Sequence, residues 1–245
     1  MNQKDKLLAN RIYLILAALF IASLVTSNLI FQKFFYWYPF QIEIFDVKLF
    51  EVSVGLLPYP LTFLITDILS EIYGKRKANE VVIAGIFASF FSLLIIYISK
   101  SVPATSWSEV QDDTFINVFG AAPLAVFASM AAYLFAQFID IRVYHFWKKL
   151  TKGKHLWLRN NFSTFSSQFI DTLTVLVLLC SFDIIPWDKF WGLLISGVIF
   201  KILIALIDTP FLYLVVYAFR KRFNLSMQDE ITDDVLLNSE HKTNP

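Results

Sequence analysis

The sequence predicts an all-α membrane protein with six transmembrane helices and both termini on the cytoplasmic side. Two observations lead to this fold class. Hydrophobic residues make up 57% of the 245 residues and charged residues only 17%, whereas soluble domains are about 45–50% apolar and about a quarter charged. The apolar residues also form long runs, and Lys and Arg residues gather in every second connection between those runs.

Six runs reach the roughly 20 mostly apolar residues that a transmembrane helix needs. Pro58 and Pro60 lie near the start of the second run, and we expect them to kink the helix or to leave a short re-entrant lead-in. The fourth and sixth runs exceed the hydrocarbon core, so we expect them to tilt or to project into the cytoplasm. The predicted spans are Ile12–Phe31, Val54–Tyr73, Val81–Ile98, Ala122–Phe146, Phe162–Phe182 and Phe190–Phe219.

The positions of Lys and Arg predict the orientation. Of the 21 such residues, 16 lie before the first span, after the second, in the last turns of the fourth (Arg142) or between the fourth and fifth, or after the sixth. Four lie in the other connections, and Lys201 lies within the sixth span. Because Lys and Arg are enriched in cytoplasmic loops, both termini are expected in the cytoplasm.

The chain shows no internal linker, so residues 1–223 are predicted to form one six-helix domain. Residues 224–245 are polar and are predicted to form a disordered cytoplasmic tail. On the opposite side of the membrane, Phe34–Glu51 alternates aromatic and polar residues, which predicts a short hairpin at the interface.

Composition also excludes several classes of protein. The net charge is only +1, so no basic surface for nucleic acid is indicated. The single cysteine, Cys180, excludes a disulfide framework and a cysteine-built metal site. Of the three histidines, His145 and His155 lie at or beside basic cytoplasmic segments, away from the acidic residues of the spans. The sequence therefore predicts neither a metal nor a cofactor.

Four aspartates and one lysine lie within the predicted spans, where an ionised side chain costs about 2.5–3.5 kcal/mol on insertion scales. At 1.5 Å per residue, Asp171 and Asp208 each lie about 18 Å from a cytoplasmic arginine and hence near the midplane. Asp67 and Asp140 form a second layer at a depth of about 12 Å. Lys201 is one heptad outward of Asp208 on nearly the same face. We expect all five to line a shared interior rather than face lipid.

The spacing of these residues predicts a polar pocket walled by the second, fourth, fifth and sixth spans. Asp67 and Glu71 are four residues apart and share a helix face. The tetrapeptide Gln-Phe-Ile-Asp occurs as Gln137–Asp140 and again as Gln168–Asp171. These two copies lie on helices of opposite direction, which leaves room for a 3+3 internal repeat.

Each feature also has a purely structural interpretation. Lys201 can neutralise Asp171 or Asp208 as a structural ion pair, an alternative as well supported as substrate contact. Glu71 and Asp140 lie close enough to the cytoplasmic surface to be hydrated, and the repeated Gln-x-x-Asp can be coincidental. Asp171 with Gln168 is the pair for which the sequence supports a binding role best.

The residue types in the spans favour a binding protein over an enzyme. No His or Cys accompanies the acidic layer, and no glycine-rich phosphate loop is present among the seven glycines. An aspartate pair could in principle act as a protease-like dyad, but Asp171 and Asp208 lack flanking glycines. Carboxylate and carboxamide groups at the midplane instead suit a small ligand with several N–H donors, such as a guanine-type heterocycle.

Several segments of the chain also resemble a known family in order and spacing, over roughly residues 28–213. The segments are Pro60–Asp67 with Glu71–Arg76, Gln137–Asp140, Trp157–Asn161 with Ser163, Gln168–Thr172, and Lys201 through Asp208–Pro210 to Tyr213, with Asn28 and Lys33 at the end of the first span. Together they resemble the bacterial queuosine precursor transporters, also called the vitamin uptake transporter family. No single motif is decisive, but the combination is specific.

The resemblance implies a multi-pass importer of 7-deazaguanines (preQ0, preQ1 or queuine) in the bacterial inner membrane, which supplies tRNA modification. The substrate would be a small base, with no direct contact to nucleic acid. The residues implied in substrate binding are Asp171, Gln168, Asp208, Gln137, Lys201 and Asn28. Those implied in an inner gate or its ion pairs are Asp67, Glu71, Asp140 and Arg159.

Three alternatives stay open at this point. One is a substrate-binding subunit of an energy-coupled vitamin importer, another is a carrier of a different nucleobase, and the third is an intramembrane enzyme. The preferred precursor, the energy source of uptake and the formation of a homodimer are also open.

Overall fold

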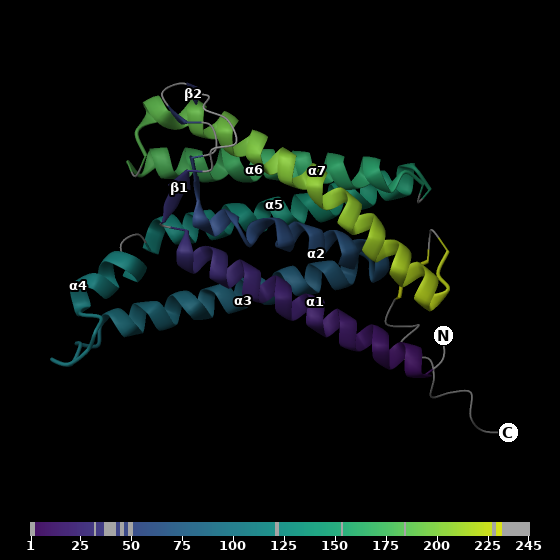
Figure 1. The fold of residues 1–245 in the computed structure, drawn as a ribbon, viewed down its shortest axis with the longest axis horizontal. Coiled ribbons are helices and arrows are strands. Elements are labelled where there is room, and N and C mark those ends of the chain that lie inside the picture. The colour runs from purple at the N-terminus through teal and green to yellow at the C-terminus, as the bar shows by residue number, and fades with distance from the viewer. Residues whose placement is uncertain are drawn as a thin grey trace.

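A computed structural model describes most of the chain as an elongated bundle of long helices (Figure 1). The described residues are 3–31, 33–36, 43–44, 47–48, 51–120, 123–152, 154–183, 185–226 and 229–231. The helices are α1 (Gln3–Ile30), α2 (Tyr59–Ile72), α3 (Gly74–Lys100), α4 (Asp112–Phe115), α5 (Pro123–Leu150), α6 (Leu156–Ser181) and α7 (Phe190–Phe223), with short turns η1 (Val54–Leu56), η2 (Ile116–Gly120) and η3 (Trp187–Lys189).

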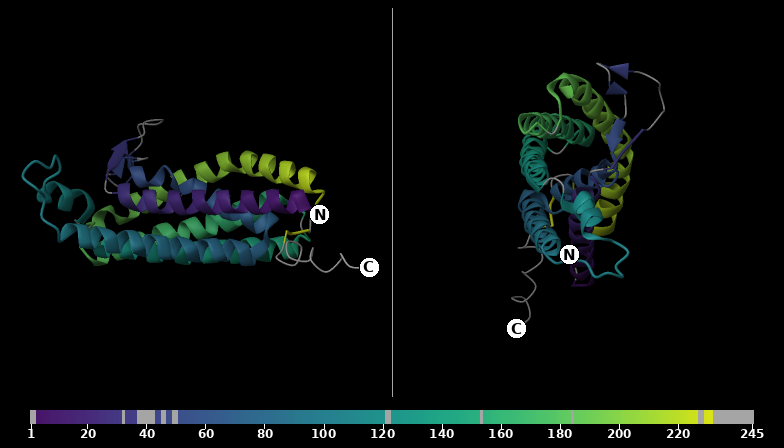
Figure 2. Two further views of the ribbon diagram at one scale, coloured as in Figure 1. Left: turned by 90° about the horizontal axis from the view of Figure 1, so that it is seen from below. Right: turned by 90° about the vertical axis from the view of Figure 1, so that its left-hand side faces the viewer.

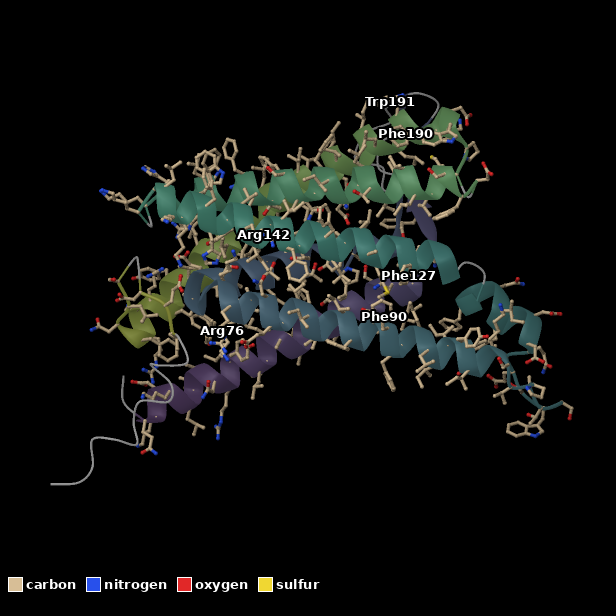
Figure 3. The ribbon with its side chains drawn as sticks, turned by 180° about the vertical axis from the view of Figure 1, so that it is seen from behind. Arg76, Phe90, Phe127, Arg142, Phe190 and Trp191 are labelled. Carbon is tan, nitrogen blue, oxygen red and sulfur yellow. The ribbon has the colours of Figure 1, made fainter. Side chains whose placement is uncertain are left out.

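Four helices of the described chain are long and apolar enough to cross a membrane, namely α1, α3, α6 and the η3–α7 stretch Trp187–Phe223. α5 has a matching length of 28 residues. Large apolar side chains project outward from these helices, such as Leu14, Phe87 and Leu214. A soluble protein would not expose so much apolar surface, which supports lipid as the surrounding solvent. Figure 3 shows this covering of side chains, among them Phe90 of α3 and Phe127 of α5, whose ring centroids are 5.7 Å apart.

The second predicted span, Val54–Tyr73, is not one continuous helix in the structure, as its prolines led us to expect. Its first residues form the turn η1, and the helix α2 begins only at Tyr59, after Pro58. The prolines expected to disturb the segment therefore break it, because proline is favoured in the first turn of a helix and removes a hydrogen bond further along it. The 14 residues of α2 extend about 21 Å, less than the hydrocarbon core of about 30 Å.

α2 occupies the centre of the bundle and packs against α1, α3, α5 and α7. α5, α6 and α7 pack in sequence order along one side (Figure 2). α1 begins and α7 ends at the same end of the bundle, whereas α4 and the strands lie at the opposite end (Figure 1). The midsection of α2 is consequently enclosed, and ten of its residues, including Asp67 and Glu71, are buried.

The connection after α1 contains short antiparallel strand pairs, in agreement with the predicted hairpin. β1 (Phe34–Tyr36) pairs with β4 (Glu51–Ser53), and β2 (Glu43–Ile44) pairs with β3 (Val47–Lys48). Residues 37–42, 45–46 and 49–50 of the predicted hairpin lie outside the described residues. The hairpin brings η1 against the end of α1, where Val54 N donates to Lys33 O at 2.7 Å.

The start of the predicted disordered tail is docked on the bundle. The side chain of Ile231 is fully buried, and its N–H donates to Ile72 O at 2.7 Å. Glu230 lies over Gly74, whose φ of +81° reverses the chain between α2 and α3. Residues 232–245 of the predicted tail lie outside the described residues.

Candidate functional site

A cavity of about 190 Å³ lies toward the strand-bearing end of the bundle. The end of α1, the turn η1, α2, α5, α6 and α7 all contribute to its wall. Its lining is mainly apolar, with a few polar groups, as is common for small-molecule sites. The polar lining residues are Ser27, Asn28, Ser53, Tyr59, Tyr133, Asp171, Thr172 and Lys201.

A buried ion pair joins α6 to α7 in the wall of this cavity. Lys201 Nζ lies 2.5 Å from Asp171 Oδ2, and the two side chains are 9% and 4% exposed. The same ammonium lies 4.8 Å from the ring centroid of Tyr59, which adds a cation–π contact. Of the two acids that the sequence offered to Lys201, the structure therefore pairs it with Asp171 and not with Asp208.

The second carboxylate oxygen of Asp171 is available to a ligand. Asp171 Oδ1 is buried and accepts no hydrogen bond from the described residues. A buried acceptor without a donor costs about 1–3 kcal/mol, so a substrate N–H group would be favoured at this oxygen. The pair as a whole is neutral, yet it presents one strong acceptor to the cavity.

Two tyrosines form an aromatic wall beside the ion pair. The ring centroids of Tyr59 and Tyr133 are 4.8 Å apart, with an angle of 59° between the ring planes. Gln137 Nε2 donates to Tyr133 Oη at 2.7 Å, and Gln137 Oε1 accepts from Thr66 Oγ1 at 3.2 Å. Gln137, which the sequence analysis placed in substrate binding, thus lies behind the wall and holds Tyr133.

The other predicted binding residues fall into two places. Asn28 lines the cavity from α1, and its Nδ2 is buried without a partner among the described residues. Gln168 and the half-buried Asp208 line a smaller recess between α2, α6 and α7, which shares Lys201 and Tyr59 with the cavity. The structure thus gathers Asn28, Asp171 and Lys201 around one cavity and places Gln168 and Asp208 next to it.

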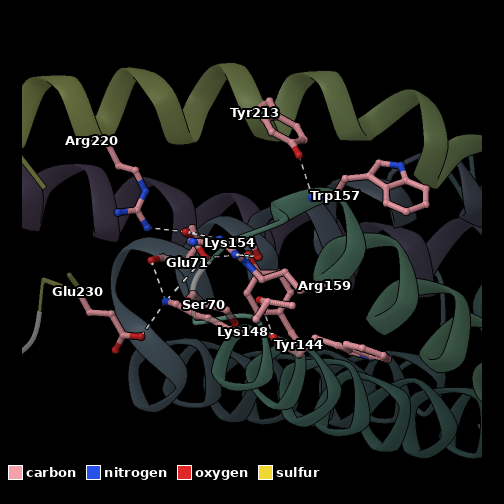
Figure 4. Close-up of polar contacts among 12 residues, drawn as sticks. Ser70, Glu71, Tyr144, Lys148, Lys154, Trp157, Arg159, Tyr213, Arg220 and Glu230 are labelled. Carbon is pink, nitrogen blue, oxygen red and sulfur yellow. Dashed lines mark hydrogen bonds and ion pairs between the residues drawn. The ribbon is translucent and has the colours of Figure 1, made fainter. Parts of the chain in front are cut away.

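A second polar cluster surrounds Glu71 near the end of the bundle that holds the start of α1 and the end of α7 (Figure 4). Arg159 Nη2 lies 2.6 Å from Glu71 Oε1, and Arg220 Nη2 contacts the same oxygen. Tyr144 Oη donates to Glu71 Oε2 at 3.1 Å. Glu71 and Arg159 are only 1% and 2% exposed, so this predicted ion pair is a buried junction of α2, α6 and α7.

Lys148 of α5 extends this cluster to the tail. Its ammonium lies 2.8 Å from Glu230 Oε1 and 3.7 Å from Glu71 Oε2, and it donates to the carbonyl oxygens of Ser70 and Glu71. Since Ile231 is anchored to the last turn of α2, the tail and Lys148 together cover this end of α2. We refer to Glu71, Tyr144, Lys148, Arg159, Arg220 and Glu230 below as the Glu71 cluster.

Asp67 and Asp140 lie between the cavity and the Glu71 cluster, and they face each other across α2 and α5. Their carboxyl groups are within hydrogen-bonding range of one another. Asp140 Oδ1 also accepts from Ser167 Oγ at 2.9 Å. Neither carboxyl group forms an ion pair with a basic side chain of the described residues, so the pair differs from Glu71, with which the sequence analysis grouped it.

Several residues of both sites carry no signal in the sequence that distinguishes them. Tyr59 and Tyr133 were not distinguished from the other aromatic residues, although Tyr133 precedes Gln137 by one helical turn. Lys148 and Arg220 resemble the other cytoplasmic positive charges in the sequence. Glu230 was assigned to the disordered tail. The described residues contain no group of three or more His, Cys, Asp or Glu side chains that could hold a metal ion.

Residues 53–215 match the model of a family described as "Putative vitamin uptake transporter". The chain is also 29% identical over 173 residues to a protein of Bacillus subtilis (strain 168) named "Probable queuosine precursor transporter", an alignment that covers 70% of this chain and 73% of the relative. No solved structure matches the chain significantly. The family match includes both the cavity residues from η1 to α7 and the central residues of the Glu71 cluster.

Proposed function

The chain belongs to the vitamin uptake transporter family, and on that basis we propose that it imports 7-deazaguanine precursors of queuosine. The family and the relative are described as transporters, so the chain is a membrane transporter of a small molecule and not an enzyme. The printed name of the Bacillus subtilis relative supports the substrate class. In this proposal, the cell uses the imported base for the modification of tRNA.

The observation that carries the proposal is the buried Asp171–Lys201 pair, which leaves one carboxylate oxygen free at the cavity. A 7-deazaguanine has a guanine-like edge with adjacent N–H donors and a neighbouring carbonyl acceptor. In the proposed complex Asp171 Oδ1 accepts from this edge, and the Lys201 ammonium faces the carbonyl. Hydrogen bonds that involve a charged group are about twice as strong as neutral ones. The Asp171–Lys201 pair would therefore strongly favour a base whose edge presents N–H donors next to a carbonyl over a base without this edge.

The aromatic wall supports a flat substrate. Tyr59 and Tyr133 present ring surfaces to the cavity, and a base that stacks on an aromatic side chain gains about 1–3 kcal/mol. Asn28 Nδ2 also lines the cavity without a partner among the described residues, so it can donate to a ring acceptor. Gln168 and Asp208 in the adjoining recess are proposed to receive the base as it moves toward the cytoplasm, because they share Lys201 with the cavity.

We also propose the orientation of the chain in the membrane and the position of an inner gate. Both termini are assigned to the cytoplasm, because α1 begins and α7 ends at the same end of the bundle and this end carries most Lys and Arg residues. The turn η1 and α2 then complete a sixth crossing within one domain of residues 1–223. The Glu71 cluster lies on the cytoplasmic side of the cavity, and we assign to it, with Arg159, the role of an inner gate.

The test is the queuosine content of tRNA in bacteria that cannot synthesise the precursors. The cells express the chain and receive preQ0, preQ1 or queuine separately at limiting concentration. Restoration by one of these bases would support import and identify the substrate. Asp171→Asn should abolish restoration even when its expression is adjusted to the wild-type membrane abundance, whereas the exposed Asp188→Asn, a matched control on η3, should not. Failure of all three bases despite good expression would contradict the proposal.

A further inference from the structure

The contact between the carboxyl groups of Asp67 and Asp140 requires a compensating cation or proton, and no group of the proposed substrate site supplies one. The two side chains are 3% and 0% exposed, and they approach each other from α2 and α5 within hydrogen-bonding range. Two ionised carboxylates at this distance repel each other, and burial without a counterion makes the repulsion more costly. The pair is therefore stable only if a cation or a proton lies between them.

Both carboxyl groups also have an oxygen without a partner. Asp67 Oδ1 and Asp140 Oδ2 are buried and receive no hydrogen bond from the described residues. One proton shared by the two groups would satisfy this need, because a protonated carboxyl donates an O–H···O hydrogen bond to a carboxylate. A buried acceptor on each of two neighbouring acids is thus the pattern expected of a proton site.

Among the described residues, the surroundings of the pair supply no other positive charge. The titratable and polar groups that face the pair are Glu71 on α2, Tyr133 and Tyr144 on α5, Ser163 and Ser167 on α6, and Asp208 on α7. The basic side chains closest to this region are already paired elsewhere. Arg159, Arg220 and Lys148 contact Glu71, and Lys201 contacts Asp171.

We propose that Asp67 and Asp140 form a proton-binding site and that substrate import is coupled to the binding and release of this proton. The inference rests on the proposed transport function and adds its energy source. One proton from the outer side would bind between the two carboxyl groups and would leave to the cytoplasm. Loss of the proton leaves two carboxylates that repel each other, which favours separation of α2 from α5.

The seam between α2 and α5 connects the proton site to both ends of the transport path. One residue before Asp67, Thr66 donates to Gln137, which in turn holds Tyr133 in the cavity wall. One turn beyond Asp67, Glu71 accepts from Tyr144 in the Glu71 cluster. A change in the separation of α2 and α5 would therefore reach the cavity wall and the inner gate together.

The test uses the purified full-length chain in proteoliposomes with the membrane potential clamped to zero. preQ0 is the probe because it carries no ammonium group. With the outside one pH unit more acidic, one proton per base should concentrate preQ0 about tenfold inside. A pH-sensitive dye in the lumen should report acidification when preQ0 is added outside, and addition of Na⁺ should change neither signal.

Counterflow of labelled preQ0 at equal pH separates the two claims. If counterflow is present but preQ0 only equilibrates under the pH gradient, or accumulates only with a sodium gradient, the proton site is refuted and the transport function stands. If no 7-deazaguanine shows counterflow, the transport function fails and this inference fails with it. Accumulation of preQ0 together with acidification of the lumen supports both the transport function and the proton site.

Amide variants of Asp67 and Asp140 test whether the coupling of import to a proton depends on these two residues. In Asp140→Asn, and separately in Asp67→Asn, the amide cannot release a proton, so we expect gradient-driven accumulation to fall from about tenfold to equilibration. The matched control is Glu80→Gln on α3, where the carboxylate is 41% exposed in surface ion pairs with Arg76 and Lys77. Accumulation at the wild-type level in both Asp variants, with both reconstituted in folded form, would overturn the assignment.

Discussion

The ammonium of Lys201 lies 2.5 Å from one carboxylate oxygen of Asp171, while the other oxygen of that carboxylate is buried without a donor among the described residues. This arrangement separates two roles of one side chain. The paired oxygen neutralises a lysine that the membrane interior would otherwise disfavour. The unpaired oxygen is left for a ligand, so stability and binding can be tested separately.

For this pair we expect a stability effect that a second substitution reverses. Asp171→Asn leaves a buried ammonium without its counterion and should lower stability by about 3–5 kcal/mol, and Lys201→Met should act similarly on the carboxylate. The double variant contains no uncompensated charge and should recover most of the loss, but it should not transport. Thermal unfolding in detergent and uptake assays give the two readouts. Recovery of uptake in the double variant would contradict a ligand role for Asp171.

For the aromatic wall we expect the ring of Tyr59 to matter more than its hydroxyl group. Tyr59→Ala removes a stacking surface worth about 1–3 kcal/mol and should raise the KM for the base by roughly 5- to 100-fold. Tyr59→Phe keeps the ring and removes only the hydroxyl group, which lies within hydrogen-bonding range of Asp171, so the two variants separate the ring from the hydroxyl. Uptake kinetics measure both, and an equal KM for the Ala variant and the wild type would show that the ring does not contact the substrate.

Loss of the Tyr133 hydroxyl group should affect substrate binding less than loss of the Tyr59 ring, and only indirectly. Tyr133→Phe removes the acceptor of the Gln137 amide and should cost about 1 kcal/mol of stability, with a modest rise in KM. Gln137→Leu breaks the same hydrogen bond and also the one from Thr66, so it should cost more, and the two effects should add less than fully because they share the Gln137–Tyr133 bond. A double-mutant cycle on thermal unfolding checks this, and fully additive effects would contradict the contact.

For the Glu71 cluster we expect a large loss of stability when the carboxylate of Glu71 is replaced by an amide. Glu71→Gln leaves the buried guanidinium of Arg159 without its carboxylate, which should cost about 3–5 kcal/mol. The exposed Glu80→Gln should cost less than about 1 kcal/mol, as surface ion pairs usually do. Thermal unfolding of both variants makes the comparison. Equal melting temperatures for the two would show that the cluster does not hold the end of the bundle together.

The docked tail provides a further test of the closed inner end. Ile231→Asp should expel the tail, because a carboxylate would replace a fully buried apolar side chain. A thiol reagent should then label Ser70→Cys, which is 1% exposed in the intact protein, several-fold faster in a Cys180→Ser background. Ser226→Ala in the same tail is the control. Unchanged labelling with Ile231→Asp would contradict a covering role for the tail.

Much of this architecture follows from rules that act on the sequence locally. Helices in lipid must be long and apolar, so the α1, α3, α6 and α7 segments are recognisable, and prolines at 58 and 60 mark the break before α2. A buried charge needs a partner, so Asp171 and Lys201 could be placed in one interior. The choice between Asp171 and Asp208 depends on the rotation of α6 against α7, which sequence spacing does not determine.

Other parts of the site depend on packing between distant segments. With 26 Phe and 10 Tyr residues in the chain, no local pattern distinguishes the rings of Tyr59 and Tyr133 as a cavity wall. Lys148 and Arg220 resemble ordinary cytoplasmic charges until the helices bring them to Glu71. The two Gln-Phe-Ile-Asp copies have different partners, since Asp140 faces Asp67 and Ser167 whereas Asp171 pairs with Lys201.

Direct binding of preQ0 to the purified protein tests the central claim, the recognition of a 7-deazaguanine by Asp171, most directly. Titration calorimetry would compare the wild type with Asp171→Asn and with the Asp188→Asn control. We expect the wild type and the control to bind alike and Asp171→Asn to bind at least about tenfold more weakly, since one charged hydrogen bond is worth about 1.5–3 kcal/mol. Equal affinity for the wild type and Asp171→Asn would contradict the proposed site.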